Sequence, residues 1–165
     1  SCAIAAACAV AAAAGKAAAG ETDLKKIMDH AVEGAKAGEK RGYKVCGPSV
    51  SRRIETAVKI AGQKKAPAEI LKDLYELIGT GLASAESIPA ALGLVVLSQG
   101  NPVLCAKYSA NIGVDTDTIG AMSCGICGAY MGDRSFEEEE VRLLEKVNAI
   151  NFDYLTDLLL PLQSA

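Results

Sequence analysis

The sequence predicts an all-α fold, a compact bundle of several packed helices. Apolar residues recur with the three- and four-residue spacing of helices, and no run alternates with period two for long enough to predict a strand. Half of the residues are apolar, but only 4% are aromatic and there is no Trp, so the core must come mainly from Ala, Leu, Ile and Val. Residues 1–165 have the size of a single all-helical domain, or of a half-domain of a longer protein, and no linker or repeat divides them.

The first helices are bounded by caps and breakers. In chain order, the expected helices of the whole chain are 2–14, 23–37, 50–61, 67–78, 86–98, 102–110, 119–131, 136–148 and 151–160. Gly15 closes the first, and Thr22 is the expected N-cap of the second. Ser49 caps the third, which Gly62 ends. Pro67 opens the fourth, because a first helical turn accepts proline.

Similar signals delimit the later helices. Gly79-Thr80-Gly81 breaks the chain before the fifth helix, and Asn101-Pro102 starts the sixth. Ser135 and the acidic run 137–140 open the eighth, where carboxylates complement the helix dipole and Glu138 fits a capping box. We therefore interpret the acidic run as a solvated helix end.

The helix 2–14 is apolar on all sides, as expected for one enclosed by neighbours. It lacks the cationic lead and the strong hydrophobicity of a secretory signal, and it is too short to span a bilayer. A domain rarely begins in the middle of its core. We therefore expect this chain to be a fragment or processed piece of a longer protein, with no membrane segment.

The charge of the chain and the positions of its cysteines exclude some classes of function and favour others. The net charge is -3 and no basic run is longer than a pair or so, which argues against a nucleic-acid partner. The cysteines lie mostly within apolar helical patterns, at positions 2, 8, 46, 105, 124 and 127. This pattern favours reduced, buried thiols in a cytoplasmic protein over a disulfide framework.

The loop 113–118 carries the most specific chemistry in the chain. Asp115, Asp117 and Thr118 bring three oxygen donors within four positions. Two carboxylates held this close repel each other unless a cation offsets the repulsion. Oxygen-only donors favour Mg²⁺, Mn²⁺ or Ca²⁺ over Zn²⁺. Because positions i and i+2 point apart on a helix, we expect a loop that ends at a helix N-terminus, with Thr118 in the first turn.

This loop has three alternative interpretations. An EF-hand beginning at Asp115 would need oxygen donors at positions that hold Ile119 and Ile126, and is excluded. The Asp-x-Asp of haloacid-dehalogenase-like phosphotransferases normally ends a β-strand near the start of an α/β domain, whereas this one follows a helical pattern. A capped helix with a spare acid stays open as the structural alternative.

Three segments of the chain resemble the ADP-ribosylglycohydrolase family. Segments 110–120 (ANIGVDTDTIG) and 125–130 (GICGAY) resemble its C-terminal signature, and segment 81–92 (GLASAESIPAAL) resembles its Ser-Val-Pro-x-Ala helix. The family also includes a dinitrogenase-reductase activating glycohydrolase and crystallins. At position 114 it usually has a second Gly, where this chain has Val114.

The resemblance implies a metal-dependent hydrolase that cleaves the ribose anomeric bond of ADP-ribosyl conjugates. Two Mg²⁺ or Mn²⁺ ions would sit in an all-helical domain, with Asp115, Asp117 and Thr118 as the ligands from this chain and Asp117 as a bridge between the ions. Leu82 would line the nucleoside pocket. The substrate would be an ADP-ribose-type small molecule or an ADP-ribosylated protein.

The same resemblance identifies what this sequence lacks. The family's catalytic Glu and its remaining metal ligands have no counterpart here, so the N-terminal half of the same protein is the expected partner, and this chain alone is expected to be inactive. Two alternatives stay open. One is a non-catalytic, crystallin-like family member, and the other is a related glycosidase acting on a nucleoside or nucleotide sugar.

Two further features have structural explanations. Cys124 and Cys127 form a Cys-x-x-Cys pair, but both lie within a predicted helix and no second ligand pair is present, so core packing is favoured over a redox or zinc site. His30, the only histidine, lies beside Asp29 in an amphipathic helix and is expected at the surface.

Overall fold

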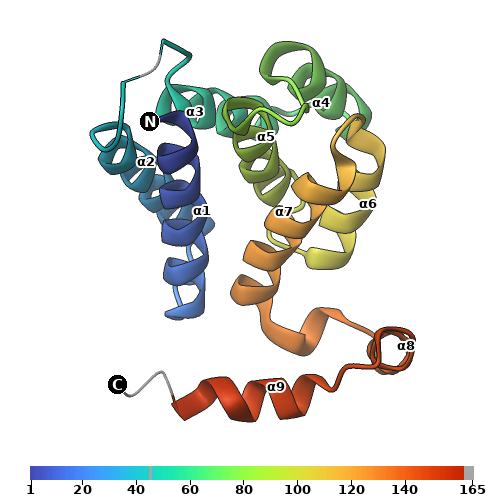
Figure 1. Cartoon of the computed structure of the whole chain (residues 1–165). Coiled ribbons are helices and arrows are strands. Elements are labelled where there is room, and N and C mark those ends of the chain that lie inside the picture. Colours follow the sequence, from blue (N-terminus) through green and yellow to red (C-terminus); the bar gives the residue numbers. More distant parts are fainter. Residues whose placement is uncertain (45, 162–165) are drawn as a thin grey trace. The chain divides into compact units, whose positions relative to one another are not determined.

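The computed structural model describes residues 1–44 and 46–161, without the side chains of residues 133 and 134, and this part of the chain is all-α, as predicted (Figure 1). The helices are α1 (Cys2–Ala18), α2 (Leu24–Glu39), α3 (Val50–Ala61), α4 (Pro67–Asp73), α5 (Ser84–Leu97), α6 (Pro102–Ile112), α7 (Thr116–Met131), α8 (Glu138–Asn148) and α9 (Phe152–Leu159). A π-helical turn, η1 (Leu74–Ile78), extends α4, and a 3₁₀ turn, η2 (Gly132–Ser135), follows α7.

Several helix ends differ from the sequence prediction for local reasons. Gly15 lies inside α1 instead of closing it, since an isolated glycine lowers helix stability without preventing helix formation. Asp23, not Thr22, caps α2, because its side chain accepts a hydrogen bond from the Lys25 N–H. At the start of α8, Glu140 accepts from the Glu137 N–H, so the predicted Ser135–Glu138 capping box is wrong.

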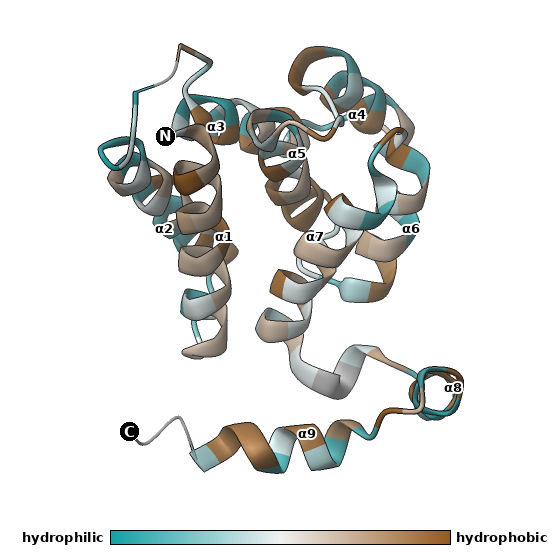
Figure 2. Cartoon of the chain, in the orientation of Figure 1, coloured by the Kyte–Doolittle hydropathy of each residue, from teal (hydrophilic) through white to brown (hydrophobic). Residues whose placement is uncertain are grey.

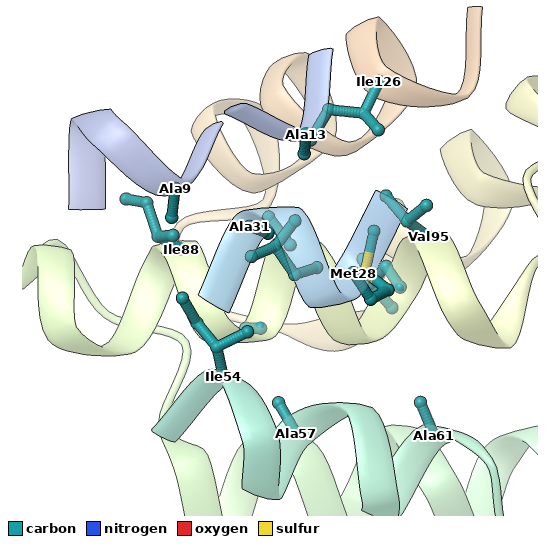
Figure 3. Close-up of a cluster of buried hydrophobic side chains, with 14 of the residues drawn as sticks. Ala9, Ala13, Met28, Ala31, Ile54, Ala57, Ala61, Ile88, Val95 and Ile126 are labelled. Atoms are coloured by element: carbon teal, nitrogen blue, oxygen red, sulfur yellow. The ribbon is translucent and has the colours of Figure 1, made fainter. Parts of the chain in front are cut away.

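Contacts divide the chain into two units, Ser1–Asp133 and Arg134–Ala165. The first contains α1 to α7 and all the buried apolar residues of the described chain. Figure 3 shows its core, where Ala9 of α1, Met28 of α2, Ile54 of α3, Ile88 of α5 and Ile126 of α7 meet. Small and medium aliphatic side chains therefore do fill the core, as the composition indicated.

Close backbone approach joins α1 to α2. A Cβ on Gly34 would lie 2.5 Å from the Cys8 carbonyl oxygen, and a Cβ on Gly38 would lie 2.6 Å from the Cα of Ala5. Only glycine permits such contacts without displacing one helix. The opposite face of α1, which includes Ala3, Ala7 and Ala11, is exposed within this chain, so the described residues do not enclose this apolar helix on every side.

The second unit contains α8 and α9, and neither helix has a buried residue. Both are amphipathic, and Figure 2 shows apolar and polar residues alternating along α9. Among the described residues, no helix is long and apolar enough to cross a membrane.

Candidate metal loop and its surroundings

The acidic loop joins two antiparallel helices, α6 and α7 (Figure 1). Gly113 ends α6 with φ 90°, and Val114 follows with φ 57°, so two successive residues have left-handed backbone torsions. Such a conformation is unusual for a β-branched residue and is a local strain of the kind found at functional sites. Because α6 leads into Asp115 where a phosphotransferase would have a β-strand, that alternative is excluded.

The three predicted ligands lie at the N-terminus of α7. Asp115 is the N-cap residue and is 7% exposed, whereas Asp117 and Thr118 lie in the first turn and are exposed. The helix begins at Thr116, three residues earlier than the sequence predicted, so Asp117 belongs to the helix and not to the preceding loop. The first-turn N–H groups carry a partial positive charge, which favours ionised carboxylates at these positions.

Neither carboxylate has a compensating partner in the described part of the chain. No ion pair involves Asp115 or Asp117, and no hydrogen bond reaches their side-chain oxygens or the Thr118 hydroxyl. An unpartnered, mostly buried carboxylate beside a second carboxylate fits a divalent cation, because the ion would offset both negative charges.

This donor set is small. Among the described residues, no group of three or more His, Cys, Asp or Glu side chains could hold a metal ion. Mg²⁺ prefers about six oxygen ligands, and the loop offers two carboxylates and one hydroxyl. The residues present therefore fit part of a magnesium or manganese site.

A second loop supports the first. The Asp115 N–H donates to the Thr80 carbonyl oxygen at 3.0 Å, which ties the acidic loop to the break between η1 and α5. The Glu86 carboxylate accepts from the Gly81 N–H at 3.1 Å. A Cβ at Gly79 or Gly81 would lie 2.7 or 2.8 Å from the same Glu86 oxygen, so a side chain at either position would displace the carboxylate from this place.

Sequence reasoning missed the roles of Thr80 and Glu86. Thr80 is 2% exposed, and its Oγ1 has no hydrogen-bond partner in the structure. The signal available was the Gly-x-Gly break followed five residues later by an acid, but nothing in the sequence showed that this break meets Asp115. Leu82, in contrast, is 85% exposed beside this loop and does not belong to the core.

Two hollows border the acidic loop. A groove of about 390 Å³ runs between α6 and α7, and its lining includes Thr116, Asp117 and Cys124. A cleft of about 590 Å³ lies between the α4–η1 segment and α6, with Tyr75, Tyr108, Lys72 and Lys107 among its lining residues.

Tyr75, which lines the larger cleft, also contacts the acidic loop. The Tyr75 ring lies 3.4 Å from where a Cβ on Gly113 would be, so this aromatic side chain packs against the start of the acidic loop. Both hollows have volumes within the usual range for small-molecule sites.

The other predicted features lie within helices, His30 in α2 and the cysteine pair in α7. His30 is half exposed, with its Nδ1 3.7 Å from a Glu33 oxygen, in agreement with the predicted surface position. Cys127 is fully buried, as core packing requires, while Cys124 is partly exposed.

Comparison with known proteins places the chain in a family. The sequence model of the ADP-ribosylglycohydrolase family matches residues 1–163. The chain belongs to the ADP-ribosylglycohydrolase family. It is 35% identical over 133 residues to a protein of Escherichia coli (strain K12) named uncharacterized protein YegU. No solved structure is significantly similar to the chain.

The similarity to YegU covers 80% of this chain but 40% of YegU, so the chain spans less than half the length of that relative. Membership of the ADP-ribosylglycohydrolase family agrees with the all-helical architecture of the described residues.

Proposed function

We propose that this chain forms one part of a metal-dependent ADP-ribosylglycohydrolase, which hydrolyses the bond between the ribose anomeric carbon and its substituent. The observation that carries the proposal is the pair of carboxylates without partners, Asp115 and Asp117, at the N-terminus of α7. They lie in the segment that resembles the family's C-terminal signature, within a family match that covers nearly the whole chain.

Each residue of the loop has a distinct task. Asp115 and Asp117 would hold Mg²⁺ or Mn²⁺, with the Thr118 hydroxyl as a neutral ligand. When bound, such an ion orients hydroxyls and water and stabilises developing charge. The Thr80 carbonyl fixes the Asp115 backbone by accepting its N–H, and Glu86 holds the Thr80 loop through Gly81. The protein thus presents oxygen donors from a position that is fixed before an ion binds.

Two divalent ions would need ligands beyond this loop. Their combined charge is +4, and the loop supplies two negative charges. We therefore propose that the N-terminal half of the same protein provides the remaining carboxylates and the catalytic Glu. The exposed apolar face of α1 agrees with packing against further protein.

The larger cleft suits an anionic nucleotide. Lys72 and Lys107 supply positive charge, and Tyr75 and Tyr108 supply aromatic surface, within reach of the acidic loop. These groups match the phosphates and the base of an ADP-ribose-type substrate, free or attached to a protein. Leu82 would add an exposed apolar contact for the nucleoside.

Two other functions remain as alternatives. A glycosidase acting on an uncharged nucleoside would have no use for the two lysines, so the cleft favours a phosphate-bearing substrate. A non-catalytic, crystallin-like member is supported by the small donor set of the described residues. Metal-dependent hydrolysis is expected of the proposed enzyme and is not expected of a crystallin-like member.

The test is a product assay on the chain alone and on its complex with the N-terminal half. ADP-ribosylated peptide, ADP-ribose and free nucleosides serve as substrates, with and without Mg²⁺ or Mn²⁺. The chain alone should release no ADP-ribose, and the complex should release it only with metal. Robust turnover by residues 1–165 alone would contradict the proposal that the N-terminal half supplies the remaining ligands and the catalytic Glu. A metal-loaded complex that hydrolyses none of the substrates would favour the crystallin-like alternative.

A matched pair of variants links the activity to the loop. Asp117→Asn should abolish release by the complex, whereas Asp153→Asn should not. Asp153 is also an exposed acid in the first turn of a helix, but it lies in α9, outside the loop.

A further inference from the structure

Three cysteines from two helices gather beside the groove between α6 and α7. Cys105 of α6 and Cys127 of α7 are fully buried, and Cys124 of α7 is partly exposed. The sequence suggested only the Cys124–Cys127 pair, because Cys105 lies nineteen positions before Cys124 and on another helix.

The register of the two helices sets Cys105 opposite Cys124. A Cβ on Gly120 would lie 3.3 Å from the Cβ of Ser109, so these two positions face each other where the helices are closest. The helices are antiparallel, as Figure 1 shows, and four residues make about one turn. One turn forward from Gly120 is Cys124, and one turn back from Ser109 is Cys105.

A direct contact supports this register. The Cys124 thiol donates to the Pro102 carbonyl oxygen at 3.7 Å, and Pro102 lies one turn before Cys105 on α6. Cys127, in contrast, lies 3.7 Å from the Ser98 hydroxyl, at the end of α5. Cys124 therefore faces α6, while Cys127 contacts the α5 end.

The protonation of the three thiols follows from the same geometry. Hydrogen bonds from Cys124 and Cys127 lower the pKa of Cys105 despite its burial. Hydrogen bonding to Cys105, together with burial, raises the pKa of both Cys124 and Cys127. The lowered pKa of Cys105 favours its thiolate as the partner that closes a disulfide.

The three thiols also differ in their exposure to solvent. Cys124 lines the groove between α6 and α7, so a small oxidant can reach its sulfur from solvent. Cys105 and Cys127 have no exposed surface.

We propose that Cys124 is a site of reversible thiol oxidation, at which peroxide leads to a disulfide with Cys105 across the α6–α7 contact. In the first step the Cys124 sulfur attacks one peroxide oxygen, the O–O bond breaks, and a sulfenic acid and water form. In the second step the Cys105 thiolate attacks the Cys124 sulfur and displaces hydroxide, which takes up the proton lost by Cys105. Overall, two thiols and one hydrogen peroxide give one disulfide and two waters.

This modification would act next to the acidic loop. The new bond would join the two helices that the loop connects, and Cys124 shares its groove with Asp117. The proposal does not depend on glycohydrolase activity, because it requires only the fold of α6 and α7.

Peptide mapping tests the proposal on the full chain. A Cys46→Ser background removes an exposed thiol that could link two molecules. After treatment with hydrogen peroxide, remaining thiols are alkylated in denaturant, and the protein is digested with trypsin without reduction. Cys105 is the only cysteine of the tryptic peptide 73–107, and Cys124 and Cys127 both lie in peptide 108–134. We expect these two peptides to be linked with the loss of two hydrogens, with fragmentation placing the bond on Cys124, and with complete reversal by dithiothreitol.

Two variants define the partners. Cys127→Ser should keep the link, and Cys105→Ser should abolish it and leave a Cys124 sulfenic acid that dimedone traps. A link to Cys127, or no link under conditions that fully oxidise Cys46 in the unmodified chain, would overturn the proposal. Because the unmodified chain is mapped as well, these outcomes are decided even if a variant fails to fold.

Discussion

Val114 shows at the scale of one residue how the acidic loop is constrained. Its φ of 57° places a β-branched residue in the left-handed region, next to Gly113 at φ 90°. Its side chain is 68% exposed, so little packing offsets the strain. The family usually has Gly at position 114, and in this chain the effect of Val114 lies in the strained backbone. The left-handed region costs an L-residue about 1–2 kcal/mol.

Replacing Val114 with Gly should therefore stabilise the protein. Relief of the strain exceeds the greater entropy that Gly adds to the unfolded chain, which is about 0.5–1 kcal/mol, so we expect a net gain of about 1 kcal/mol in the free energy of unfolding. Urea denaturation measures it. Gln99→Gly is the matched control, since Gln99 has φ 54° but is not β-branched, and its gain should be smaller. Equal gains would show that β-branching adds no strain at position 114.

The prediction on metal binding concerns Asp117. Asp117→Asn removes one of the two negative charges of the loop and leaves an oxygen that coordinates more weakly. Metal affinity in the complete protein should fall by about tenfold or more, a change as large as those caused by residues that only support metal ligands. Calorimetric titration with Mg²⁺ and Mn²⁺ measures it, with Asp153→Asn as the control. Unchanged affinity in Asp117→Asn would remove this residue from the site.

At the scale of elements, a carboxylate connects the end of α2 to the start of α3. Glu39 accepts hydrogen bonds from the Ser49 hydroxyl at 2.9 Å and from the Ser51 N–H at 3.0 Å, and Ser51 Oγ adds a further contact. Burial alone would raise the pKa of Glu39, but these hydrogen bonds outweigh it and lower the pKa below the ordinary 4.5. The N-terminus of α3 also favours the charged form.

This connection makes stability depend on pH. Because the pKa of Glu39 is lower in the folded state, its contribution is fully present above the unfolded pKa and is lost as the pH falls through the folded value. Glu39→Gln should therefore lower the free energy of unfolding by about 1–2 kcal/mol at pH 7, with a difference that shrinks as the pH drops below about 4.5. Unfolding curves at pH 7 and in acid measure it.

Glu33→Gln is the control for this effect. Glu33 is exposed on the same helix, and its carboxylate lies 3.7 Å from His30. We expect almost no loss at pH 7. A loss as large as that of Glu39→Gln would show that a general charge effect on α2, not the cap of α3, explains the result.

At the scale of the whole molecule, the core is confined to one unit. Every buried apolar residue of the described chain lies between Ala5 and Cys127, and α8 and α9 contribute none. Segments with little buried surface open more easily than a packed core, so stability should differ sharply along the chain.

Limited proteolysis should reveal this difference. Brief digestion with trypsin should cut first after Arg142 and Lys146 of α8, leaving a large fragment that ends at residue 142 or 146. Lys36 and Lys59 are the comparison sites, because they lie on helices whose inner faces belong to the core. Mass spectrometry over a time course identifies the order of cleavage. Early cleavage after Lys36 or Lys59 would contradict the expected distribution of stability.

The sequence by itself determined the class of the fold and the identity of the acidic loop. Helical spacing and caps predicted α3 at its observed bounds, because Ser49 and Gly62 act on the residues beside them. Asp115, Asp117 and Thr118 were found for the same reason, since a loop that carries its donors within four positions can be read locally. Their role as metal ligands stays a prediction, as does that of Leu82.

Only the tertiary structure decided what meets this loop. The Thr80 carbonyl accepts from Asp115 across 35 positions, Glu86 holds the Thr80 loop, and Cys105 lies opposite Cys124. Such pairings depend on how far one helix slides and turns against another, and side-chain packing over the whole interface fixes that register. A sequence pattern records which face of a helix is apolar, but it does not record which residue of another helix that face will meet.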